Sequence, residues 1–183
     1  GFSEYGFPES HAASFALLVY ASCWIKCHYP AQFLVAMLNS QPLGFYTPSQ
    51  LVQDARRHDV TVRPVDVMDS DWDCTIQDED GAFEVRLGLR LVSHLAKATG
   101  LRIVEARQQA PFDSADDLAR RAGVSDSEMK VLAGADALMS LSGHRRQQVW
   151  DAAALKAAPA LLTEAPIDED YLELRAAPEG EEV

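Results

Sequence analysis

The residues with the clearest chemical potential in the first part of the chain are two cysteines and a histidine. Cys23 and Cys27 stand four positions apart, about one turn of a helix, and His28 follows directly. Thiolate and imidazole groups bind zinc, but the chain offers no second ligand pair at a suitable spacing. The pattern therefore favours buried, reduced thiols in a cytosolic protein over a metal site.

A second concentration of reactive groups is the acidic stretch between residues 66 and 80. Its members are Asp66, Asp69, Asp71, Asp73, Asp78, Glu79 and Asp80. Carboxylates bind divalent cations, yet residues 78–80 lack the ligand spacing of a calcium-binding loop. The sequence favours a solvated turn there, and we expect no metal ligand in this chain.

Helical periodicity dominates the stretch that carries the first two cysteines. Between Ser10 and Pro30 the chain has no glycine or proline, Ser10 can cap a helix, and Pro30 ends the pattern. One face collects Phe15, Leu18, Val19, Ser22 and either Ile25 or Lys26. We expect a helix that buries this face and has a polar C-terminal end.

The next stretches predict short elements. Residues 31–39 and 48–58 carry apolar positions at helical spacing, and Thr47 or Ser49 can cap the second helix. Residues 60–67 alternate with β-branched side chains and predict an extended segment, although a proline within it excludes a central strand.

A β-hairpin is predicted in the middle of the chain. Residues 72–77 and 82–87 flank an Asp-Gly turn, which is a typical hairpin signal. Because this is the main β signal, the expected fold class is mainly α with a small β-hairpin.

The following stretch predicts short helices joined by tight turns. Residues 87–107 carry two apolar faces, with Gly100 between them. Ser114 can cap the next helix, a further helix spans residues 127–133, and the last begins near residue 142 and runs to about 157. Such a compact unit has no room for a catalytic cleft of its own.

The net charge of −12 is unevenly distributed. Residues 1–85 carry 4 Lys and Arg against 12 Asp and Glu, and residues 158–183 carry 1 against 8. Residues 86–157 carry 11 against 8, so only this part can approach a polyanion without a large electrostatic penalty. The small excess does not predict strong autonomous DNA binding.

No signal pattern or membrane-length apolar run is present, so we expect a cytoplasmic protein without membrane contact.

A longer series of residues extends through the first helix. It comprises Tyr5-Gly6-Phe7, Ser10-His11, Ala12-Ala13, Phe15-Ala16-Leu17, Tyr20, Trp24-Ile25-Lys26, His28-Tyr29-Pro30-Ala31 and Phe33. This order resembles a block in the fingers of bacterial C-family replicative DNA polymerases. Pro8-Glu9 and the segment from Asn39 to Tyr46 resemble the error-prone branch most. The resemblance runs from Gly1 to about Trp150.

The resemblance implies a domain organisation. Residues 1–85 correspond to the C-terminal part of the fingers with a small β element, and residues 86–157 to a tandem helix-hairpin-helix unit of the DNA-binding type. Residues 158–183, rich in Ala, Pro and acids, are expected to form an acidic flexible linker. The magnesium-binding aspartates of the family lie in the palm, upstream of Gly1. We therefore expect no catalytic residue and no cofactor in this chain.

The resemblance also implies candidate contact residues. On the nucleotide side they are Ser10, His11, Lys26 and His28, because lysine or protonated histidine can offset phosphate charge. For the DNA backbone they are Ser93, His94, Lys97, Arg120, Arg121, Lys130, Arg145 and Arg146.

The first hairpin departs from the family pattern. Helix-hairpin-helix loops carry Gly-hydrophobic-Gly, which lets backbone N–H groups approach a phosphate. Ser93-His94-Leu95 stands at the loop here, and neither glycine is present. A hairpin that serves only in packing therefore remains an alternative.

Two functions follow from these features. The first is a part of an error-prone DNA-directed DNA polymerase for translesion synthesis and damage-induced mutagenesis, which contributes fingers and duplex contacts but is inactive without the palm. The second is a protein–protein interaction module of a mutagenic repair complex, favoured by the negative charge and the missing glycines. Duplex primer-template DNA is the expected partner of the first. A sliding clamp and accessory mutagenesis proteins are further candidates, through regions near or beyond the tail.

Overall fold

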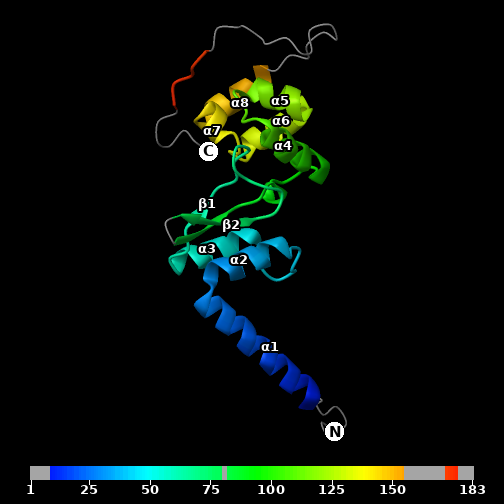
Figure 1. Cartoon of the computed structure of the whole chain (residues 1–183), viewed down its shortest axis with the longest axis vertical. Coiled ribbons are helices and arrows are strands. Elements are labelled where there is room, and N and C mark those ends of the chain that lie inside the picture. The colour runs from blue at the N-terminus through cyan, green and yellow to red at the C-terminus, as the bar shows by residue number, and fades with distance from the viewer. Residues whose placement is uncertain (1–8, 80–81, 155–171, 177–183) are drawn as a thin grey trace. The chain divides into compact units, whose positions relative to one another are not determined.

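The computed structural model describes residues 9–79, 82–154 and 172–176 (Figure 1). The chain forms two compact units, residues 1–62 with 76–85 and residues 63–75 with 86–183. Helices predominate, and the described strands form one three-stranded sheet. The predicted fold class, mainly α with a small β element, is confirmed. None of the described helices is long and apolar enough to cross a membrane.

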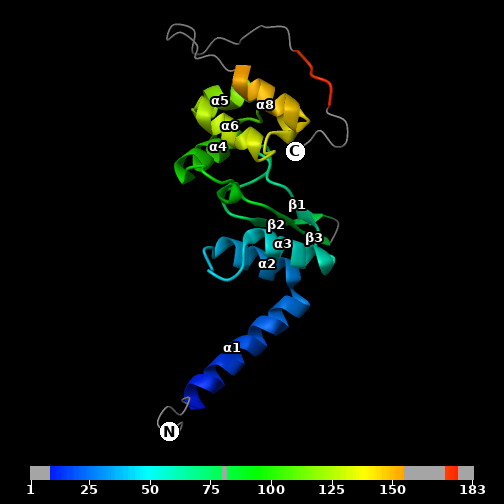
Figure 2. The ribbon, with the colours of Figure 1, turned by 180° about the vertical axis from the view of Figure 1, so that it is seen from behind.

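The first unit contains helices α1 (Glu9–His28), α2 (Pro30–Asn39) and α3 (Pro48–Arg57). Helices α2 and α3 pack side by side, as both ribbon views show (Figures 1 and 2). Thr47 caps α3, as predicted, because its Oγ1 accepts a hydrogen bond from the Gln50 backbone N–H at 3.3 Å. The Gln50 side chain closes the capping box by accepting from the Thr47 N–H at 3.0 Å.

Helix α1 differs from its prediction in two respects. Glu9 is already helical, so Ser10 lies in the first turn and not at the N-cap. The expected inner face is exposed, with Phe15 at 51% and Leu18 at 62% of their full accessible area. No other described element covers this face. Periodicity predicted the helix correctly, but it cannot show whether a covering surface exists in the same chain.

The cysteines were predicted to be buried, and this is correct for only one of them. Cys74 is buried, whereas Cys23 and Cys27 on α1 are exposed. The exposure of this pair has the same cause as that of the apolar face, because both lie on a helix that the described chain leaves largely uncovered.

The sheet consists of β1 (Val62–Arg63), β2 (Thr75–Glu79) and β3 (Ala82–Arg86), in the order β1-β3-β2. Strands β2 and β3 form the predicted hairpin, whose turn at residues 80–81 lies outside the described residues. The N–H groups of Val85 and Leu87 donate to the carbonyls of Thr61 and Arg63, which is the pattern of a parallel pair between β1 and β3.

The second unit holds the remaining helices. They are the 3-10 helix η1 (Leu89–Leu91), α4 (Lys97–Gln109), α5 (Ala115–Ala122), α6 (Asp126–Gly134), α7 (Met139–Ser142) and α8 (Arg145–Ala154). Helix α6 packs along α8 and α4 along α5. Ile103, Leu118, Met129, Leu132 and Leu138 are fully buried in the core of this unit.

Gly100 lies inside α4 and does not separate two elements, contrary to its expected place between two apolar faces. A Cβ atom at this position would lie 2.5 Å from Cε3 of the Trp72 ring. The glycine therefore lets the indole pack directly against the helix backbone. The sequence alone did not show whether Gly100 ends a helix or allows close packing inside one.

Candidate nucleic-acid interface

The first hairpin joins η1 to α4 through residues 92–96. His94 has a φ of 66°, in the left-handed region that normally favours glycine. Leu95, the next residue, is buried in the core. The loop therefore keeps the positive-φ turn without its usual glycine, and the missing glycine does not by itself abolish the hairpin.

The N-terminus of α4, which follows this turn, has no side-chain cap, although the hydroxyl of Thr99 in its first turn donates to the Glu128 carboxylate. Its N-cap residue Ala96 offers no side-chain hydrogen bond, and the first turn contains no acidic residue. Unsatisfied first-turn N–H groups carry partial positive charge and bind anions. Ser93, His94 and Lys97 are all exposed around this end. The structure thus brings three of the predicted DNA-contacting residues together at one helix N-terminus.

The second hairpin, at residues 123–125, has the usual glycine. Gly123 adopts a φ of 59° after α5, and Val124 is buried. The side chain of Ser125 caps α6 by accepting from the Glu128 N–H at 3.4 Å.

A carboxylate already occupies the N-terminus of α6. Glu128 Oε2 accepts from the Ser125 N–H at 2.9 Å and from the Ser125 hydroxyl at 2.7 Å. Glu128 Oε1 accepts from the Thr99 hydroxyl. The hydrogen bond from Thr99 is the largest cause that lowers the pKa of Glu128 below its ordinary value. A phosphate approaching this end would meet an ionised carboxylate and the nearby Asp126.

Arg102 reinforces the closed second hairpin. Its guanidinium donates to the carbonyls of Ala122 at 2.9 Å and Gly123 at 3.1 Å. The capping of the two helix N-termini therefore does not follow the presence of a loop glycine. The helix after the hairpin that lacks glycine has no side-chain cap, whereas the helix after the hairpin that has glycine is capped by Ser125 and Glu128.

Two of the predicted DNA-contacting arginines have partners inside the unit. Arg120 and Arg121 both pair with Asp117, at 2.7 and 3.0 Å. Arg121 also donates to three backbone carbonyls near the C-terminal end of α4, those of Ala106, Ala110 and Pro111. Its guanidinium lies 4.9 Å from the Phe112 ring centroid. Arg121 therefore ties α5 to α4 and is poorly placed to bind a ligand.

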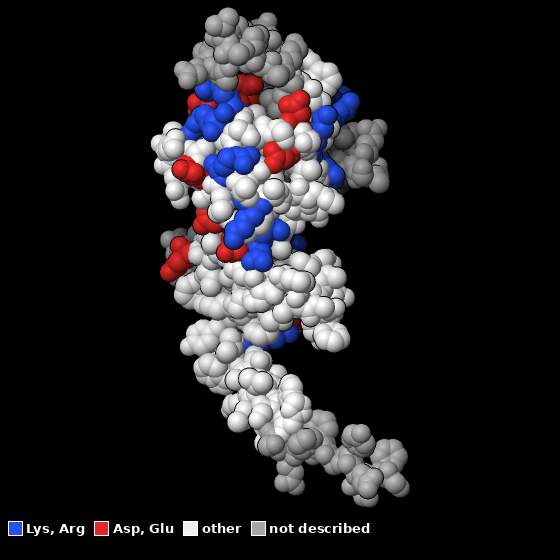
Figure 3. All heavy atoms as spheres, turned by 90° about the vertical axis from the view of Figure 1, so that its right-hand side faces the viewer, with Lys and Arg blue, Asp and Glu red and all other residues white. Residues whose placement is uncertain are grey.

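The three other predicted basic residues are exposed. Lys130 lies on α6, and Arg145 and Arg146 begin α8. In the described chain no carboxylate pairs with any of them, although Arg145 donates to the Gly134 carbonyl at 3.1 Å. Figure 3 shows one face on which Lys and Arg side chains alternate with Asp and Glu and do not form a continuous basic surface.

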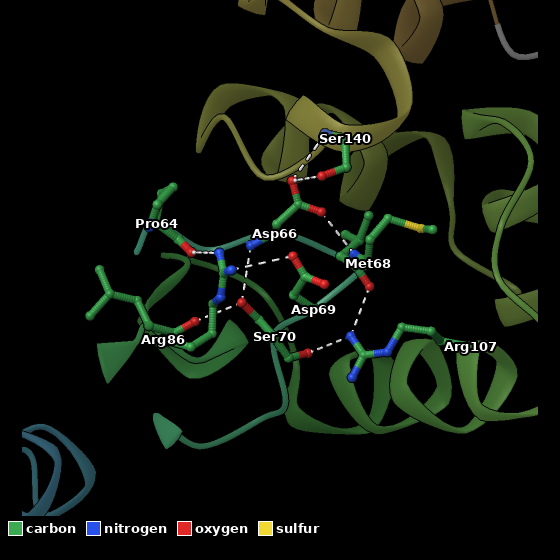
Figure 4. Close-up of polar contacts among 10 residues, drawn as sticks. Pro64, Asp66, Met68, Asp69, Ser70, Arg86, Arg107 and Ser140 are labelled. Atoms are coloured by element: carbon green, nitrogen blue, oxygen red, sulfur yellow. Dashed lines mark hydrogen bonds and ion pairs between the residues drawn. The ribbon is translucent and has the colours of Figure 1, made fainter. Parts of the chain in front are cut away.

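A buried polar cluster holds the segment after β1 against the helices that carry the hairpins (Figure 4). Asp66 is 4% exposed, and its carboxylate accepts from the N–H and the hydroxyl of Ser140 in α7. The hydroxyl of Ser70 donates to the Leu87 carbonyl at 2.7 Å. Arg107 of α4 donates to the Val67 and Ser70 carbonyls at 2.9 and 2.8 Å. The hairpin helices are thereby fixed to the preceding segment.

Three further aspartates in this segment each pair with a different arginine. Asp69, Asp71 and Asp73 bind Arg86, Arg107 and Arg90, at 3.3, 2.9 and 2.7 Å. Sequence reasoning did not find these partners. The alternation of acids was the only signal in the sequence, and it does not indicate which distant arginines complete the pairs.

The predicted nucleotide-side residues are spread along α1. His11 lies about 22 Å from Lys26 along the helix axis, given the rise per residue. His11 packs against Phe15 and His28 against Trp24, with ring centroids 4.4 and 4.5 Å apart. The side chain of Ser10 lies outside the described residues. The structure does not bring these residues into one site.

Lys26 lines a pocket of about 540 Å³ among α1, α2 and α3. Its ammonium lies 2.6 Å from the Asp54 carboxylate on α3. The hydrogen bond from Lys26 is the main cause that lowers the pKa of Asp54. Cys23, Cys27 and apolar side chains of α2 complete much of the wall.

Residues 59–148 match the family model of a helix-hairpin-helix motif. Over 186 residues the chain is 55% identical to an error-prone DNA polymerase of Bordetella parapertussis. It is 53% identical over 189 residues to that of an Azoarcus species and 49% identical over 202 residues to that of Methylococcus capsulatus. The matches cover the whole chain but only 18–19% of these relatives. The chain is homologous to one segment of the error-prone DNA polymerases.

The helix-hairpin-helix match contains the whole described candidate interface. Both hairpins and the Asp66 cluster lie between residues 59 and 148, whereas α1 lies outside that range. Among the described residues, no three His, Cys, Asp or Glu side chains cluster so as to hold a metal ion.

Proposed function

We propose that this chain is part of an error-prone DNA-directed DNA polymerase used in translesion synthesis and damage-induced mutagenesis. Its similarity along its full length to error-prone DNA polymerases supports this most directly. In the proposal the chain supplies fingers helices and contacts to duplex primer-template DNA in the cytoplasm. Magnesium and the catalytic carboxylates belong to the palm, so the segment alone does not turn over nucleotides.

The uncapped N-terminus of α4 is the proposed primary DNA contact. Phosphate contacts position a duplex without reading its sequence, which suits a template of any sequence. Backbone N–H groups of the first turn and the ammonium of Lys97 would meet one phosphate, with Ser93 and His94 on its rim. Lys130, Arg145 and Arg146 would add longer-range attraction. Arg120 and Arg121 are not among the proposed DNA contacts. Asp117 pairs with both, and backbone carbonyls also bind Arg121.

The matched test compares Lys97→Ala with Arg120→Ala, which removes the same formal charge. Each chain would be titrated with fluorescent primer-template DNA at about 50 and 200 mM salt, across which a set of real phosphate contacts loses affinity steeply. Lys97→Ala should weaken binding and reduce the salt slope by about one, whereas Arg120→Ala should change neither. Equal losses in both variants would contradict the assignment of the contact to the first hairpin.

On the nucleotide side, Lys26 is the candidate with the clearest environment. Its ion pair with Asp54 places a carboxylate beside the ammonium, which weakens the attraction of Lys26 for a phosphate. Ser10, His11 and His28 stay proposed contacts that lie on the same helix. The exposed apolar face of α1 is proposed to pack against other parts of the polymerase.

That exposed face also favours a second candidate function, a protein–protein interaction module of a mutagenic repair complex. Exposed apolar patches of this kind mark protein contacts, and α1 exposes Phe15, Leu17, Leu18 and Tyr20. A sliding clamp or accessory mutagenesis proteins would then be the partners. DNA binding that is negligible at both salt concentrations would support this function over the first.

A further inference from the structure

A short piece of the C-terminal tail is bound to the start of α8. Residues 172–176 were expected to belong to a flexible linker, but three of their backbone groups form hydrogen bonds with side chains at α8. Leu174 donates its N–H to Gln147 Oε1 at 2.7 Å, and Gln147 Nε2 donates to the Leu172 carbonyl at 3.1 Å. His144 Nε2 lies 2.9 Å from the Leu174 carbonyl. Two side chains thus bind three backbone groups of Leu172 and Leu174.

Gln147 acts like a residue of a neighbouring strand. Its amide accepts from the N–H on one side of Glu173 and donates to the carbonyl on the other, as the backbone does in a parallel pair. The Gln147 side chain is only 2% exposed, and Asp151 accepts from the same Nε2 at 2.7 Å. The bond to Asp151 does not involve the segment and orients the amide.

His144 is oriented by the helix that it precedes. Its Nδ1 accepts from the Gln147 backbone N–H at 3.3 Å at the start of α8. The neutral ring can accept at one nitrogen only, so Nε2 carries the proton and donates to the Leu174 carbonyl. The helix start thereby fixes the tautomer that the peptide contact needs.

The bound segment contributes few side chains to the contact. Leu174 is half-buried, whereas Leu172, Glu173, Arg175 and Ala176 are exposed. Recognition therefore rests on the extended backbone and on one leucine. Such a mode resembles the addition of a strand, in which the main chain supplies affinity and one pocket supplies specificity.

We propose that the start of α8, formed by His144, Gln147 and Asp151, is a binding site for extended peptides anchored by one leucine. Its occupant is the chain's own segment, residues 172–176. The site is independent of the proposed DNA contact at α4. It keeps residues 172–176 of the acidic C-terminal stretch on the helix-hairpin-helix unit.

Amide hydrogen exchange on the intact chain tests the occupant. In the wild type the Leu174 N–H should exchange roughly tenfold more slowly than the unbonded amides beside it. Leu174→Asp should remove this protection, because it places a charge in the anchor position. Leu172→Asp is the matched control and should keep it, since only the Leu172 carbonyl makes the contact. An unprotected Leu174 amide in the wild type would overturn the proposal.

A labelled peptide with the sequence of residues 168–178 tests whether the site recognises a peptide in trans. It should bind the Leu174→Asp chain, whose own segment has been released, and should bind the wild type far more weakly. Adding Gln147→Ala to the Leu174→Asp chain should abolish binding, with circular dichroism to confirm that the helices persist. Failure of the peptide to bind the Leu174→Asp chain, or equal binding to the wild type, would contradict the proposal.

Discussion

Asp66 and Ser140 are 74 positions apart in sequence, yet the Asp66 carboxylate accepts hydrogen bonds from the Ser140 N–H at 3.0 Å and from its hydroxyl at 2.8 Å. Asp66 Oδ1 also accepts from the Met68 N–H at 2.8 Å. A single buried carboxylate thus fixes its own turn and the N-terminal end of α7. The interface helices depend on this connection for their placement against the preceding segment.

Removing the Asp66 carboxylate should destabilise the second unit strongly. Asp66→Ala removes a buried carboxylate that accepts three hydrogen bonds, so we expect a loss of about 2–4 kcal/mol. Ser140→Ala removes only the hydroxyl bond and should cost about 1 kcal/mol. Urea unfolding measures both. Similar losses of stability in the two variants would mean that the Asp66 carboxylate contributes no more than the Ser140 hydroxyl.

The contact between Gly100 and Trp72 should make Gly100→Ala destabilising although it lies in a helix. Alanine normally improves a helix interior by up to about 1 kcal/mol, but here its Cβ would meet the indole at 2.5 Å. We expect a net loss of about 1–3 kcal/mol. Gly134→Ala is the matched control in α6, because a Cβ there has nothing within 4 Å. A Gly100→Ala chain as stable as the wild type in thermal unfolding would refute the close contact.

The lowered pKa of Glu128 should make stability depend on pH in the acid range. Because the folded pKa lies below the ordinary value of 4.5, the ionised group stabilises the fold above that pH. This contribution disappears as the pH falls through the folded pKa. Glu128→Gln should therefore lose stability near neutrality and approach the wild type in acid. A constant difference in Tm between the two chains across the pH series would rule out this linkage.

The three cysteines should differ in reactivity. Cys23 and Cys27 are exposed, whereas burial is the main cause that raises the pKa of the Cys74 thiol. Because the thiolate is the reactive form, a disulfide reagent at mildly alkaline pH should modify two thiols rapidly and the third only on unfolding. Cys74→Ser should leave the fast phase unchanged. A fast phase of one or three thiols would disagree with the structure.

Local sequence signals determined much of the secondary structure. The caps at Thr47 and Ser114 were predictable because each side chain bonds to a backbone N–H three residues away. The hairpin of β2 and β3 followed from alternation around an Asp-Gly turn in the same way. The resemblance along residues 5–33 identified the polymerase relationship, which the full-length identities confirm.

Tertiary structure decided which predicted residues are available for binding. Arg121 and Lys97 are equally basic in sequence, but only Arg121 has a carboxylate and three carbonyls around it. Similarly, His94 takes the positive φ that the sequence rules reserve for glycine, because the flanking helix and the burial of Leu95 fix the turn. Hydrogen bonds between residues a few positions apart can be predicted from the sequence. The partners of a side chain depend on which distant segments fold against it, and for α1 the described chain supplies no covering surface.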